Sequence, residues 1–127
     1  MKNKLITLLI IMLLPLYSMA DQWDDTFLQL VADKNNALPY DIVEGYQVFD
    51  IDYNLKQRIF KNHIQITKSN ITKQMIEQEY NRDIAEFCKI EDTQTTLNEG
   101  ISYQFLFYRQ QNETPFLIIT IDKTVCK

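Results

Sequence analysis

The chain has 127 residues, of which 46% are hydrophobic and 12% aromatic, and its formal net charge is −4 at pH 7. This length suits one domain with a sizeable core. The acidic balance excludes nucleic acid as an expected partner, because contacts to phosphates need an excess of Lys and Arg. It also argues against adsorption to an anionic membrane surface.

The N-terminal segment predicts an exported protein. Two lysines precede an apolar run from Leu5 to Leu14, and Ser18-Met19-Ala20 supplies the small residues of a cleavage site. This run is too short to span a bilayer as a helix, which takes about 20 residues, and the whole arrangement is typical of a secretory signal peptide. We therefore expect a signal peptide at 1–20, a single periplasmic or secreted domain at 21–127, and no stable membrane anchor after cleavage.

The cysteine content favours one structural disulfide. Cys88 and Cys126 are the only cysteines, and export would place them in an oxidising compartment where thiols pair. They are too far apart in sequence for a redox pair of the C-x-x-C type. Two cysteines without clustered histidines also do not supply a zinc site.

The first half of the mature segment predicts a helix followed by a hairpin. Trp23, Phe27 and Val31 recur at four-residue steps, which predicts a short helix over 24–33. Alternating patterns predict strands at 42–53 and 58–67, joined by a turn at 54–56. Strict alternation in the first strand places one set of side chains on one face (Gln47, Phe49, Ile51, Tyr53) and the other set opposite (Tyr46, Val48, Asp50, Asp52).

The second half predicts a long helix and further strands. A helix is expected over 71–88, with Ser69 or Asn70 as its N-cap and an apolar stripe made of Ile76, Tyr80, Ile84, Phe87 and Cys88. A short edge strand at 93–98 and strands at 101–109 and 116–125 follow. The predicted class is α+β, in the order α-β-β-α-β-β(-β), with an antiparallel sheet of four to five strands and both helices packed on one face.

No group of residues predicts catalysis. His63 is the only histidine and lies on the polar side of a predicted strand. Asp50 and Asp52 share one strand face about 7 Å apart, a spacing that could flank a glycosidic bond, but nothing around them predicts a sugar cleft. We interpret all three as exposed strand residues. The expectation is therefore a protein that is not an enzyme, with no catalytic residue, no metal site and no cofactor.

Several short motifs carry a family resemblance. They are Asn36-Ala37-Leu38-Pro39, Phe87-Cys88, the segment from Thr96 to Tyr103, and Cys126. Their order and spacing over residues 26–126 resemble the AspS-type secretin pilotins of type II secretion systems. The resemblance implies a periplasmic-facing α+β domain that binds a C-terminal segment of the secretin. Members of that family are lipoproteins, and this chain departs from them because Ser18-Met19-Ala20-Asp21 has no lipobox cysteine.

The leading functional hypothesis is a non-enzymatic exported module, pilotin-like in fold, that binds a protein or peptide partner such as a secretion-system component. A groove between the long helix and the sheet is the expected site, with Tyr80, Ile84 and Tyr108 as candidate contact residues. The alternative is a periplasmic inhibitor or immunity protein, whose acidic charge would speed association with a basic toxin or hydrolase. An enzyme or ligand carrier that uses His63 and Asp52 is the third hypothesis. A monomer or weak dimer is expected.

Overall fold

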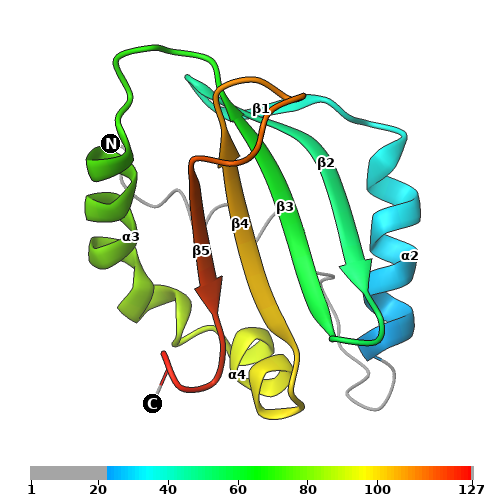
Figure 1. Ribbon diagram of the computed structural model, residues 1–127. Helices are drawn as coiled ribbons and strands as arrows, with labels where there is room; N and C mark the ends of the chain where they lie inside the picture. The colour runs from blue at the N-terminus through cyan, green and yellow to red at the C-terminus, as the bar shows by residue number, and fades with distance from the viewer. Residues whose placement is uncertain (1–22, 127) are drawn as a thin grey trace.

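The computed structural model describes residues 23–126 and has an α+β fold (Figure 1). In chain order the described elements are α2 (Trp23–Asn35), β1 (Tyr40–Val43), β2 (Tyr46–Asn54), β3 (Ile59–Ile66), α3 (Lys73–Phe87), α4 (Glu91–Asn98), β4 (Ser102–Tyr108) and β5 (Leu117–Ile121). This order confirms the predicted class. The predicted signal peptide at 1–20 lies outside the described residues.

The five strands form one sheet in the order β1-β2-β3-β4-β5. Three of the four neighbouring pairs are antiparallel, as expected, but β3 and β4 run parallel. The chain passes from β3 through α3 and α4 before it returns as β4. A helical crossover of this kind is what a parallel pair requires, because a tight turn can join only antiparallel strands.

The strand expected over 42–53 is two strands, because a tight turn at Glu44 and Gly45 separates β1 from β2. Gly45 has a φ of +94°, and a Cβ atom there would lie 2.6 Å from Cδ1 of Ile71. Only glycine fits this conformation and this close approach at little cost. The β1–β2 hairpin therefore depends on Gly45.

A β-bulge changes which β2 side chains enter the core. The register between β2 and β3 shifts between Val48 and Asp50, where β2 carries one extra residue. As a result Tyr46, Val48, Ile51 and Tyr53 are all buried in the core. The prediction from strict alternation, which placed Ile51 and Tyr53 on the face opposite Tyr46 and Val48, was therefore wrong.

Residues 93–98 form part of the helix α4, so the predicted edge strand was wrong. Threonine in general favours strands, because its branched side chain fits a pleated surface. Here the hydroxyl of Thr95 donates to the carbonyl of Glu91 at 3.0 Å, and that of Thr96 donates to the carbonyl of Asp92 at 3.0 Å. Bonds to the preceding turn satisfy these hydroxyls within the helix.

Three further boundaries differ from the predictions. The N-cap of α3 is Thr72, whose hydroxyl accepts a hydrogen bond from the Met75 amide, and not Ser69 or Asn70. The predicted turn at 54–56 lies at 55–58. β5 ends at Ile121, four residues before the predicted end.

Tyr103 of β4 shows that the three described helices, α2, α3 and α4, cover the same face of the sheet. Its ring centroid lies 6.0 Å from that of Phe27 in α2 and 5.7 Å from that of Phe87 in α3. Its hydroxyl forms a hydrogen bond with Thr96 of α4. Because each helix contacts this one buried side chain, the core lies between the helices and a single face of the sheet, as predicted.

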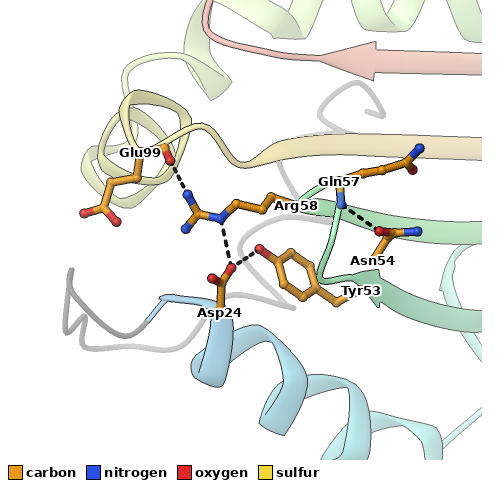
Figure 2. A network of polar contacts seen from close by, with 6 residues as sticks. All are labelled: Asp24, Tyr53, Asn54, Gln57, Arg58 and Glu99. Atoms are coloured by element: carbon orange, nitrogen blue, oxygen red, sulfur yellow. Dashed lines mark hydrogen bonds and ion pairs between the residues drawn. The ribbon is translucent and has the colours of Figure 1, made fainter.

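A polar network holds three distant segments together at one end of the sheet (Figure 2). The carboxylate of Asp24 accepts hydrogen bonds from the Tyr53 hydroxyl and, at 3.0 Å, from Nε of Arg58. Arg58 also donates to the carbonyl of Glu99 at the end of α4. Partial burial alone would raise the pKa of Asp24, but the bonds from Tyr53 and Arg58 and the charge of Arg58 outweigh it and lower that pKa.

The predicted disulfide is present between Cys88 and Cys126, whose Cα atoms lie 5.3 Å apart. It joins the residue that follows α3 to the C-terminal turn after β5. Within residues 23–126, no helix has both the length and the apolar character that crossing a membrane requires.

Candidate functional site

A groove of about 490 Å³ lies between α3 and β5. Glu77, Tyr80 and Asn81 line it from α3, and residues 117–120 line it from β5. Among residues 23–126, β5 is the last strand of the sheet and pairs with β4 on one side only. The backbone groups on its other edge are therefore open to pairing with an added strand. Figure 1 shows α3 running alongside this edge of the sheet.

The groove has an acidic character. Glu77 contributes a carboxylate to its wall, and the described lining contains neither lysine nor arginine. Burial raises the pKa of the Tyr80 hydroxyl, and the negative charge of Asp122, one residue after β5, raises it further. A cationic group brought into the groove would therefore be favoured over an anionic one.

The three predicted contact residues do not come together. Tyr80 is half-buried and lines the groove. Ile84, one turn further along α3, packs against the core as Tyr80 does, but it does not line the groove. Tyr108 lies on the face of the sheet away from the helices, since its neighbour Phe107 belongs to the core. The structure therefore offers Tyr80 alone of the three to a segment bound in the groove.

A second cluster of polar side chains occupies that outer face of the sheet. His63 on β3 is central to it: its Nε2 lies 2.7 Å from Oδ2 of Asp52, and its Nδ1 lies 2.8 Å from the hydroxyl oxygen of Tyr108. Asp50 is opposite His63 in the β2–β3 register. Phe49 packs edge-on against Tyr108, with ring centroids 5.1 Å apart.

The β2 bulge explains why the sequence did not predict this cluster. Asp50 and Asp52 were assigned to one face correctly, but their proximity to His63 depends on the β2–β3 register, which the bulge shifts. The side chain of His63 is only 15% exposed, so it is more enclosed than the expected exposed strand residue. Burial raises the pKa of Tyr108, and the charges of Asp50 and Asp52 raise it further.

A smaller cavity of about 140 Å³ lies beside the disulfide, between α4 and the C-terminal turn. Leu97, Lys123 and Cys126 are among its lining residues. Its volume is well below the roughly 300–1,000 Å³ of typical small-molecule pockets. We do not assign a ligand to it.

Solved structures with a similar fold include two pilotins. The pilotin EpsS from the Vibrio vulnificus type 2 secretion system aligns with a TM-score of 0.62 at 10% identity, covering 85% of this chain and 94% of its own. AspS, the type II secretion pilotin of Vibrio cholerae, aligns with a TM-score of 0.57 at 13% identity, covering 84% and 94%. The fold is similar to that of type II secretion pilotins.

The expected pilotin-like fold is therefore confirmed. A Pseudomonas aeruginosa protein described as secreted has a similar structure, with a TM-score of 0.60 at 13% identity over 87% of this chain and 99% of its own. No protein-family model matches the sequence, and no curated protein matches it significantly. At identities of 10–13% the likeness concerns the fold alone.

Proposed function

We propose that this protein is an exported, non-enzymatic binding module that holds an extended segment of a partner protein in the groove between α3 and β5. The observation that carries the proposal is the open edge of β5 beside the half-buried ring of Tyr80. An added strand can form backbone hydrogen bonds with such an edge while its alternate side chains enter the adjoining groove. The fold similarity to pilotins and the disulfide support a role outside the cytoplasm.

The dimensions and charges of the groove define the partner segment. β5 has five residues, which corresponds to about 17 Å of extended backbone, so a bound strand would be about five residues long. The acidic lining favours a segment that carries lysine or arginine. The family resemblance makes a secretion-system component, such as the C-terminal segment of a secretin, the first partner to test.

Site-specific crosslinking in cells tests this proposal. A photo-reactive amino acid at position 80 should yield one defined adduct with an exported or outer-membrane protein, and mass spectrometry should map the crosslink to a short segment with basic residues. The matched control is position 78, which is exposed on the same helix but is not part of the groove lining. Equal adducts at positions 80 and 78, or no adduct at position 80, would refute the groove as the binding site.

A charge change provides the second test. Asn81→Lys places a cation in the groove and should weaken binding of the mapped segment at least tenfold, because it opposes the basic residues of that segment. Gln78→Lys adds the same charge to the exposed surface of α3 and should change the affinity less than twofold. If the segment proved to belong to a toxin or hydrolase that the protein inhibits, the inhibitor alternative would replace the secretion role.

A further inference from the structure

The outer face of the sheet holds three potential metal ligands at one point. Asp50, Asp52 and His63 each offer one ligand atom, and these atoms all lie within 4.8 Å of one another. We propose that they form a binding site for a divalent transition-metal ion of the Zn²⁺ type. The site lies on the opposite face of the sheet from the core and involves neither α3 nor β5, so it is independent of the proposed groove.

The β2 bulge brings these groups together. Asp50 and Asp52 alternate onto the same face, and the shifted register sets Asp50 opposite His63 on β3. A bulge beside a functional site commonly re-aims a side chain in this way. All three ligands are therefore held by neighbouring strands of the sheet, which limits the backbone rearrangement that binding requires.

The distances are compatible with coordination. Zinc binds imidazole nitrogen and carboxylate oxygen at about 2.0–2.2 Å, so two ligands of a tetrahedral ion are about 3.3 Å apart. Nε2 of His63 and Oδ2 of Asp52 form a hydrogen bond at 2.7 Å, so these two atoms would separate by about 0.6 Å when the ion binds. Asp50 is exposed, so its side chain can rotate toward the ion. Two carboxylates also neutralise the charge of a divalent ion.

Tyr108 supplies the second contact that a ligating histidine requires. Ligation through Nε2 leaves the proton on Nδ1, which can donate it to the Tyr108 hydroxyl oxygen 2.8 Å away. In the metal-free arrangement Nε2 is in hydrogen-bond contact with Asp52 and Nδ1 with the Tyr108 hydroxyl, so these two contacts already orient the ring. Such a partner fixes the ring and tautomer of a metal-bound histidine.

The donor set identifies the class of ion. Imidazole nitrogen favours zinc and its transition-metal neighbours, whereas Ca²⁺ and Mg²⁺ prefer sites made of oxygen alone. Three protein ligands leave at least one position of the ion open to water or to a partner's side chain. A site of calcium type would not need His63.

Calorimetric titration with ZnCl₂ tests the site on the disulfide-bonded protein, purified without a histidine tag. We expect one ion per chain. His63→Ala should weaken binding at least a hundredfold and Asp50→Asn at least tenfold, while Tyr108→Phe should weaken it about tenfold. The matched control is Asp41→Asn, which removes the same charge from the exposed surface of the neighbouring strand β1 and should leave the affinity within twofold. Circular dichroism confirms that each variant is folded.

Imidazole NMR adds a readout that does not depend on affinity. Because His63 is the only histidine, the imidazole nitrogen signals in the spectrum can be assigned to it without ambiguity. Zinc should shift the Nε2 signal and leave Nδ1 protonated. Four outcomes would overturn the proposal: no stoichiometric binding, binding retained in His63→Ala, ligation through Nδ1, or displacement of zinc by equimolar CaCl₂. Equal losses of zinc affinity in Asp41→Asn and Asp50→Asn would also overturn it, because they would show that the ion is attracted only by the overall negative charge.

Discussion

Removing the disulfide between Cys88 and Cys126 should cause a large loss of stability. The bond closes a loop with a sequence separation of 38 residues. In the chain-entropy description, a cross-link stabilises the native state by limiting the conformations of the unfolded chain. For a loop of this length the effect is about 4 kcal/mol at 25 °C. The free energy of unfolding of a small domain is only about 5–15 kcal/mol, so this one bond provides a substantial share of it.

The double variant Cys88→Ala/Cys126→Ala isolates this effect. Both side chains are only partly buried, so their truncation removes little packing. We expect the free energy of unfolding to fall by about 4 kcal/mol, and the melting temperature by roughly 15–30 °C for a domain of this size. Urea unfolding followed by circular dichroism measures the first quantity, and a thermal scan measures the second.

Two internal comparisons make the test decisive. Each single variant also lacks the bond and should lose nearly as much stability as the double variant. The dependence of the unfolding free energy on urea should steepen in all three, because the unfolded chain without a cross-link exposes more surface. A loss below about 1 kcal/mol, or an unchanged dependence on urea, would refute the assignment of the effect to the unfolded state.

Three further substitutions test the fold. Asp24→Asn should lower the unfolding free energy by about 1 kcal/mol at neutral pH. Because the folded-state pKa of Asp24 is lowered from 3.8, the difference between the two proteins should be full above pH 3.8 and should shrink as the pH falls from there through the folded-state pKa. Urea midpoints at pH 7 and pH 2.5 would show a smaller difference at the lower pH. Asn62→Val should raise the unfolding free energy by about 1–2 kcal/mol, because the amide of Asn62 is fully buried without a hydrogen-bond partner among the described residues; a loss in chemical denaturation would contradict this. Thr72→Ala should lower it by about 1 kcal/mol through loss of the α3 cap, whereas Thr72→Ser should not.

The sequence predicted the elements whose residues share one dominant period. The helix at 24–33 and the strands at 58–67 and 101–109 are present because their apolar side chains recur at helical or alternating steps. The disulfide could be predicted because the chain has only two cysteines. These features depend on local pattern or on a count, and neither requires knowledge of which strands are neighbours.

The errors arise where strand pairing, or side-chain hydrogen bonds that periodicity does not reveal, decide the structure. The bulge in β2 depends on pairing with β3, whereas the Thr96 hydroxyl of α4 bonds to the backbone one turn earlier and to Tyr103. The parallel pair has its own signal in the order of the elements. A strand, a helical segment and a second strand in succession favour a parallel crossover, and this is the order of β3, α3, α4 and β4.

The two proposed sites follow from one consequence of that topology. The parallel crossover puts β4 between β3 and β5, so β5 becomes an edge strand and the groove beside α3 is left open. The same placement of β4 beside β3 brings Tyr108 to His63 on the outer face. Had β4 paired in another position, neither the open edge nor the oriented imidazole would exist. A swap in strand order would therefore remove both sites, whereas His63→Ala should remove metal binding and leave the groove intact.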